Sequence, residues 1–287
     1  MMNFKLLEYI SIDEDLIKKL TDLALEDEVS ILYFSDRLFN GNSSCLSGKS
    51  PLFKLAVVLK AAEKTYQLYR KYGISDKVFQ DTFSDIAIWC ENCGNKGLEN
   101  VSWLKNHICF ELFRLGRLQF QMFTCVNPTL RYSKLPFSRN DKMVYIHIPQ
   151  GEKLNYNECM KSIHEADIFF KKYFPDFAYK FYFSESWLLF DGNREFMAQN
   201  SNILSFMNLF DIHYSVSDES QAFERIFNVN LNFKSILYKM NRSKRKSDIN
   251  CLSQSTSLQK AAKNYLIAGG KLGVGIATIP KNKYNDL

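Results

Sequence analysis

The sequence contains no apolar run that approaches the roughly 20 residues needed by a membrane-spanning helix. Its first residues, MMNFKLLEYISIDEDL, do not place an apolar stretch after a basic one, as a secretory signal peptide does. The basic excess is small, since 37 Lys and Arg face 31 Asp and Glu, which gives a net charge of +6. A dedicated DNA-binding protein has a larger, clustered excess. We therefore expect a cytoplasmic protein with no membrane partner, whose charge suits a ligand that carries phosphates better than nucleic acid.

The seven cysteines also exclude a class of protein. An odd number does not form a complete set of disulfides, and cytoplasmic thiols stay reduced. Cys90 and Cys93 form a CxxC pair, but the preceding FSDIAIW continues a helical pattern. The pair is therefore predicted near a helix end, where the helix dipole disfavours a thiolate. Because the sequence has no second CxxC and no His pair at zinc-finger spacing, we predict no metal site.

Two common phosphate and hydrolase motifs are missing as well. No GxSxG surrounds a serine, and no GK[ST] follows a glycine-rich loop. The glycines from Gly269 to Gly275 follow a predicted helix rather than precede one, so they are interpreted as a helix stop and a tight turn. The basic run RSKRK (242–246) lies in a polar stretch and is interpreted as a solvated loop, with contact to ligand phosphates, and after it contact to nucleic acid, as the alternatives.

What is present begins as a series of amphipathic helices. Apolar residues recur at helical spacing over 13–25, 51–72, 76–89 and 104–115. Pro51 suits the first turn of a helix, and Gly73 suits a helix end. We predict that the last helix of this half ends at Gly116.

The pattern changes near Gly116, where runs rich in β-forming residues begin. The predicted strands are 118–126, about 129–134, 143–148, about 179–189, 212–216 and the GVGIATI run at 273–279. The predicted helices among them are 155–173, about 202–210 and 256–268. Helices followed by a mixed sheet with packed helices indicate an α+β protein of two domains, residues 1–115 and residues 116–287.

The segment Met143–Asp176 predicts an apolar strand, a short polar turn and an amphipathic helix. The free N–H groups in the first turn of such a helix can bind a phosphate or polarise a carbonyl. His147 lies on the strand just before the turn, where an imidazole with a pKa near neutrality suits a general base. A core histidine that bonds to the backbone is the alternative.

Glu185 and Ser186 lie near the end of the next predicted strand. A carboxylate flanked by hydroxyls there could remove the proton of an amine. The alternative is that Glu185 points to solvent. Strand alternation places Glu185 and Ser186 on opposite faces, so both face one cleft only if the strand is bulged.

A larger set of residues runs in the order of a known bacterial family over most of 110–275. These residues are Gly116, Arg117, Leu118, Gln119, His147, Ile148, Pro149, Gly151, Leu154, Cys159, Ser162, Ala166, Phe169, Phe170, Phe174, Pro175, Ser186, Trp187, Leu188, Leu189, Ser201, Asn202, Ile203, Phe206, Arg225, Ile226, Phe227, Thr256, Ser257, Leu258, Gln259, Gly269 and Gly270. Through them the chain resembles the acyltransferases that have an N-acyltransferase N-terminal domain and a GNAT-like C-terminal domain. The helical half fits that family mostly by pattern.

The resemblance implies a GNAT-like fold and transfer of an acyl group from acetyl-CoA or another acyl-CoA to an amine. The acyl-CoA would lie between strand 143–148 and helix 155–173, with its pyrophosphate on backbone N–H groups from Gln150 to Tyr156. We take Ile148, Gln150, Gly151, Asn155 and Tyr156 as the cofactor-binding residues. His147, or else Glu185 with Ser186 beside it, is the candidate catalytic group.

The sequence departs from the wider GNAT pattern at two places. The turn PQGEKLN has one glycine where [QR]-x-x-G-x-[GA] has two, and residues 199–210 contain no tyrosine to act as the acid. These departures motivate an alternative, a catalytically inactive GNAT-like module that binds an acyl-CoA, a nucleotide or a protein partner. A thiol enzyme that uses Cys159, in the first turns of a predicted helix, is a third possibility.

Overall fold

The structure is a computed structural model that describes residues 5–125, 136–229, 248–281 and 283. The chain forms two compact units and passes between them several times. The first unit contains Met1–Phe123, Val144–Glu152 and Lys161–Ala178, and the second contains Thr124–Met143, Lys153–Met160 and Tyr179–Leu287. The predicted domain boundary near residue 115 stays a prediction.

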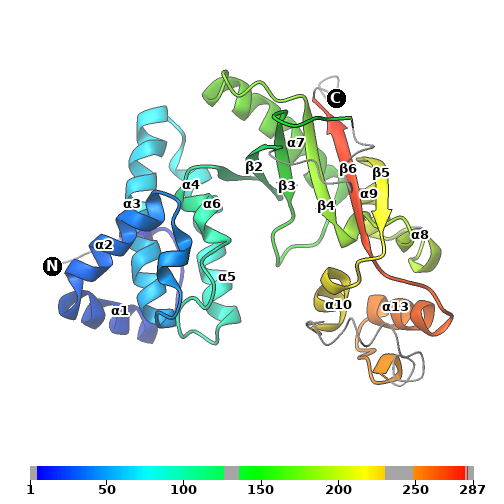
Figure 1. The fold of residues 1–287 in the computed structure, drawn as a ribbon, viewed down its shortest axis with the longest axis horizontal. Helices are drawn as coiled ribbons and strands as arrows, with labels where there is room; N and C mark the ends of the chain where they lie inside the picture. Colours follow the sequence, from blue (N-terminus) through cyan, green and yellow to red (C-terminus); the bar gives the residue numbers. More distant parts are fainter. Residues whose placement is uncertain (1–4, 126–135, 230–247, 282, 284–287) are drawn as a thin grey trace. The chain divides into compact units, whose positions relative to one another are not determined.

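The first unit begins with helices, drawn from blue to blue-green in Figure 1. They are η1 (Lys5–Glu8), α1 (Glu14–Glu26), α2 (Glu28–Phe39), η2 (Ser43–Leu46), α3 (Pro51–Tyr72), α4 (Asp76–Phe83), α5 (Asp85–Asn92) and α6 (Leu104–Ile108). The sequence patterns predicted α1 and α3 closely, but they missed α2 and joined α4 to α5 across Ser84.

Helix α3 is the centre of this unit because its middle turns are buried on every side. The Ser50 hydroxyl accepts a hydrogen bond from the Phe53 N–H at its start, and Gly73 ends it with a left-handed φ of 69°. Residues 55–59 are fully buried. The predicted start and end of this helix are therefore confirmed, together with their capping residues.

The predicted helix over 104–115 is wrong beyond Ile108. The helix α6 stops there, and β1 (Leu112–Leu115) follows and pairs antiparallel with β2 (Leu118–Thr124). Gly116, at a φ of 61°, makes the turn between these strands. Three of the four β1 residues are buried, so the apolar pattern suits a helix as well as a strand. The pairing with β2 decides between them.

Strand β3 (Lys142–His147) and helix α7 (Tyr156–Tyr173) match the predicted strand–turn–helix. Within the sheet, β2 lies between β1 and β3. The α7 residue Phe169 packs on Phe113 of β1 with ring centroids 4.9 Å apart, and Phe174 lies 5.2 Å from the same ring. This aromatic cluster attaches the helix to the hairpin.

In the second unit, β6 (Val274–Pro280) lies between β4 (Phe181–Ser186) and β5 (Asp211–Val216) and runs antiparallel to both. All three strands were predicted from the sequence, although the residues after Ser186 form η4 (Trp187–Leu189) rather than more strand. The short helices α8 (Asn193–Phe196) and α9 (Asn202–Met207) follow. The run predicted as a strand at 129–134 lies outside the described residues.

In a separate small core of this unit, α10 (Ser220–Phe227) packs against α13 (Ser257–Ile267). Figure 1 shows the two helices beside each other. Thr256 and Gln259 form a reciprocal capping box at the start of α13. Gly269 follows this helix with a φ of 96°, so its predicted role as a helix stop is confirmed. The α+β order, helices first and then strands with helices, agrees with the prediction.

Candidate functional site

His147 is the last residue of β3, and three side chains of the first unit hold its ring. Its Nε2 lies 2.9 Å from Oε1 of Gln121 on β2. The Tyr145 ring stacks on it at 4.1 Å, and the Trp103 ring meets it edge to face at 4.7 Å. His147 is therefore fixed by a hydrogen bond and by two aromatic rings, and it is half-buried.

These contacts determine the protonation of His147. Because an amide oxygen only accepts, Nε2 must carry the hydrogen, and Nδ1 keeps the lone pair. Burial lowers the pKa of His147 to about 3, and the charge of His107 acts in the same direction, although Asp85 opposes it. The ring is therefore neutral near pH 7, with Nδ1 able to accept a hydrogen bond.

A buried carboxylate lies in the same unit. Asp85, the first residue of α5, accepts three hydrogen bonds on Oδ2, from Gln119 Nε2 at 2.8 Å, Trp103 Nε1 at 3.2 Å and His107 Nε2 at 3.2 Å. Burial by itself raises the pKa of Asp85. The hydrogen bond and the charge of His107, together with the hydrogen bonds from Gln119 and Trp103, outweigh burial and lower the pKa. The carboxylate is therefore ionised.

Arg117 fastens the turn that follows β3. Its Nη1 donates to the Pro149 carbonyl at 3.0 Å, and its Nη2 donates to the Glu152 carbonyl at 2.6 Å. Its own N–H donates to the hydroxyl of Ser162 on α7. Because the guanidinium donates to the carbonyls at both ends of residues 149–152, it fixes the backbone of the turn. It also places a positive charge next to the turn.

The predicted cofactor-binding residues of this turn lie in different environments. Ile148 is half-buried, whereas Gln150 is exposed and accepts a hydrogen bond from Asn92 at 3.5 Å. Gly151 has a φ of 109°, a conformation that favours glycine. No atom lies within 4 Å of the position that a Cβ would take on Gly151, so space is open beside it.

Asn155 and Tyr156 lie at the start of α7, in a part of the chain assigned to the second unit. The Asn155 side chain accepts from the N–H groups of Asn157 at 2.9 Å and Glu158 at 3.2 Å. It therefore caps the helix. Tyr156 is 37% exposed.

Glu185 and Ser186 lie on β4 of the second unit, opposite Ile276 and Gly275 of β6. The Ser186 hydroxyl accepts from the Leu188 N–H at 3.2 Å and so caps η4. Glu185 is half-buried and Ser186 is buried, as alternation along a strand requires. The hydroxyl of Ser186 thus has a local structural role.

The glycines near the C-terminus allow close packing of the chain. A Cβ on Gly275 would overlap with the Leu189 carbonyl, and one on Gly273 would overlap with the Val216 carbonyl. This explains their presence without a phosphate, although Gly275 lies within β6 rather than in the tight turn that the sequence predicted. The basic run at 242–246 lies outside the described residues.

Burial argues against a nucleophilic role for Cys90 and Cys159. Cys90 and Cys93 lie at the end of α5 and just after it, as predicted, and burial raises the pKa of Cys90 to about 12. Cys159 is buried in the first turn of α7. Across the described parts of the chain, no group of three or more His, Cys, Asp or Glu side chains is arranged to hold a metal ion.

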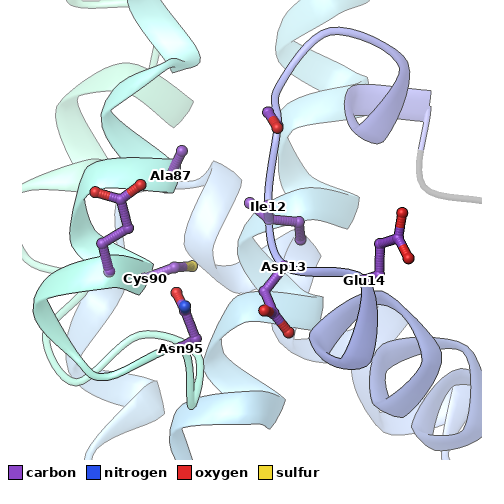
Figure 2. A pocket seen from close by; sticks show the side chains of 8 residues that line it. Ile12, Asp13, Glu14, Ala87, Cys90 and Asn95 are labelled. Carbon is purple, nitrogen blue, oxygen red and sulfur yellow. The ribbon is translucent and has the colours of Figure 1, made fainter.

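A cavity of about 330 Å³ lies between the start of α1 and the end of α5. Figure 2 shows Asp13, Glu14, Cys90 and Asn95 around it. The Asp13 carboxylate already caps α1 by accepting from the Leu16 N–H at 3.1 Å. The cavity contains none of the predicted site residues, and its lining offers acidic groups rather than a phosphate site.

Asp85, Trp103 and His107 were not predicted from the sequence as site residues. Arg117 and Gln119 were identified there only as residues shared with the family. The run Gly116–Gln119 was the available signal, and the structure explains each of its residues. Gly116 makes a turn, Arg117 binds the turn after β3, Leu118 is buried in the core and Gln119 donates to Asp85. Nothing in the sequence pairs residue 85 with residues 103, 107 and 119.

Two family models match the chain. The N-acyltransferase N-terminal domain matches residues 5–110, and the GNAT-like C-terminal domain matches residues 112–279. The chain belongs to this family. The resemblance inferred from the sequence is thereby confirmed, and so is the fold class, a helical N-terminal region followed by a GNAT-like sheet with helices. No curated protein matches the sequence.

Solved structures of acyltransferases share the fold. One in complex with decanoyl-CoA and teicoplanin, and one in complex with CoA and 10C-teicoplanin, are each 20% identical to this chain with a TM-score of 0.72. Each match covers 96% of this chain and 86% of the other. An acyltransferase mutant in complex with octanoyl-CoA is 19% identical with the same TM-score. In the described ranges of this family member, no helix has the length and apolar character to cross a membrane.

Proposed function

We propose that the protein is an acyl-CoA-dependent N-acyltransferase, which moves an acyl group from a CoA thioester to an amine of a small molecule or peptide. Family membership supports the acyl transfer. The structural observation that carries the proposal is His147, which is held neutral with its Nδ1 lone pair available where β3 ends. Two structural neighbours in complex with an acyl-CoA, and one in complex with CoA, support the donor.

We propose direct transfer. The amine nitrogen attacks the thioester carbonyl carbon, the new C–N bond forms, and the C–S bond breaks to release CoA. The nitrogen loses one proton, which His147 Nδ1 accepts, and the sulfur leaves as a thiolate that takes up a proton from His147 or from water. A backbone N–H where β3 ends, at Ile148, would stabilise the carbonyl oxygen.

A base with a pKa of about 3 limits which form of the amine reacts. His147 would not remove a proton from a free ammonium ion efficiently, so the acceptor must bind as the neutral amine. The proton of the attacking nitrogen becomes far more acidic once the C–N bond forms, and at that stage a weak, fixed base is sufficient. Glu185, with Ser186 beside it, is the alternative base.

The proposed seat of the CoA pyrophosphate is the backbone from Gln150 to Tyr156, including Gly151 and Asn155. Three observations support it. Arg117 places a positive charge beneath this turn, Gly151 leaves open space, and Asn155 caps a helix whose N-terminus favours anions.

Calorimetric titration with CoA, acetyl-CoA and decanoyl-CoA tests the donor, and mass spectrometry with a panel of amines tests the transfer. We expect Gln150→Glu to weaken decanoyl-CoA binding by about tenfold, since the added charge repels the pyrophosphate. The matched control is Gln67→Glu, on an exposed position of α3, which should bind as the wild type does. If no CoA compound binds, the proposed donor is wrong.

The second candidate is an inactive binding module. The observations that favour it are the one glycine at the turn and the lack of tyrosine in 199–210. It predicts that decanoyl-CoA binds and stabilises the fold but that no acylated amine forms. Detection of any acylated product with the purified protein would exclude it.

A further inference from the structure

The hydrogen-bonded cluster around Asp85 has no part in the mechanism above, yet it is among the most buried polar groups of the first unit. Asp85 is 5% exposed, Gln119 1% and His107 0%. Its members come from α5, α6 with the preceding residue, and β2. Packing alone does not require them, since apolar residues would fill the same space at a lower desolvation cost.

The cluster is also imperfectly satisfied. Nδ1 of His107 is buried and has no hydrogen-bond partner among the described residues. A buried nitrogen of this kind costs free energy, and so does a buried carboxylate. Buried polar groups that lower stability in this way can serve to fix the position of neighbouring side chains. The neighbours of this cluster are therefore the next question.

Two connections lead from Asp85 to His147. The first is Trp103, whose Nε1 donates to Asp85 and whose ring meets the His147 ring at 4.7 Å and 80°. The second is β2, where Gln119 donates to Asp85 and Gln121, two residues later on the same face, bonds His147. The carboxylate thus restrains both the indole and the strand that hold the imidazole.

We propose that Asp85 is a positioning residue, whose carboxylate fixes the Trp103 indole and, through Gln119, the strand that carries Gln121, and thereby the orientation of the His147 ring. The inference rests on the proposed role of His147 in acyl transfer. Asp85 does not touch the reacting atoms, so it acts through Trp103 and through Gln119.

Histidine NMR tests this without any substrate. The chain has four histidines, and labelled imidazole signals can be assigned by replacing each in turn. In the wild type we expect the Nε2–H tautomer for His147 and a nuclear Overhauser contact with Trp103. In Asp85→Asn we expect loss of that contact or a mixture of tautomers, and in Trp103→Phe we expect a mixture of tautomers. Trp103→Phe keeps an aromatic ring, so it remains informative if Asp85→Asn is unstable.

Trp89→Phe is the matched control, because Trp89 lies on the same helix as Asp85 and should leave the His147 signal unchanged. An unchanged His147 signal in Asp85→Asn and in Trp103→Phe, with both proteins folded, would overturn the inference. Once an acceptor is identified, Trp103→Phe should lower kcat by about tenfold with the KM for decanoyl-CoA unchanged. Failure to bind decanoyl-CoA would contradict the proposed function and leave the NMR result standing, so the two failures are distinguishable.

Discussion

The Nε2 of His147 lies 2.9 Å from the Gln121 side-chain oxygen, and this one contact decides which nitrogen of the ring can take a proton. Replacing the amide by a carboxylate, in Gln121→Glu, keeps the acceptor and adds a negative charge. We expect the pKa of His147 to rise by about 1–3 units, since an opposite charge favours the imidazolium. Histidine NMR titration measures it, and an unchanged pKa would show that the two side chains are not bonded.

The low pKa of His147 also predicts how stability depends on pH. In the folded protein the pKa is about 3, whereas a histidine in the unfolded chain titrates at about 6.5. Between these values the unfolded state binds the extra proton. The contribution of His147 to the free energy of unfolding is therefore complete above pH 6.5 and is lost as the pH falls towards 3. Each unit of pH removes at most about 1.4 kcal/mol.

Urea unfolding at pH 7 and pH 5.5 checks this dependence. We expect His147→Gln to lose less stability on acidification than the wild type does. His213, whose pKa burial also lowers, contributes in the same direction and serves as a comparison through His213→Gln. An equal loss in the wild type and in His147→Gln would contradict the prediction.

Arg117 should contribute strongly to stability. In Arg117→Met the carbonyls of Pro149 and Glu152 lose their donors, which we expect to cost about 2–4 kcal/mol in urea unfolding. Arg37→Met is the control, because Arg37 is exposed and donates to the hydroxyl of Tyr33, and it should leave the urea midpoint nearly unchanged. Similar effects of both substitutions would argue against the clamp.

Gly275 and Gly269 should respond differently to substitution by alanine, because one is closely packed and the other is not. In Gly275→Ala the new methyl group overlaps with the Leu189 carbonyl, and we expect a loss of about 3 kcal/mol or more. In Gly269→Ala only the left-handed backbone is strained, which costs about 1 kcal/mol. Thermal unfolding of the two variants compares them. If either variant, while folded, lost affinity for decanoyl-CoA more than tenfold, the structural interpretation of that glycine would be wrong.

Ser186→Ala separates two roles of one hydroxyl. Loss of the cap on η4 should lower stability by about 1 kcal/mol. Ser186→Ala and, as a separate variant, Glu185→Gln are then assayed for acyl transfer per folded molecule. A decrease in kcat beyond the loss of folded protein would assign the residue to the chemistry as well.

Much of the fold could be predicted because the signals are local. The caps of α3, the strand–turn–helix around His147, the capping box of α13 and the order of helices before strands all depend on residues close together in the chain. The missed strand β1 shows the limit. Its apolar residues suit a helix or a strand, and its partner β2 decides.

The sequence by itself determined the family, the order of helices before strands and His147 as the candidate group, since these depend on residue types and their spacing. The tertiary structure decided the protonation of that histidine and the surroundings of the turn. Burial beside Trp103 and the bond to Gln121 set the state of the ring, and Arg117 reaches the turn from the β1–β2 hairpin. These contacts join residues tens of positions apart, and no local pattern specifies them.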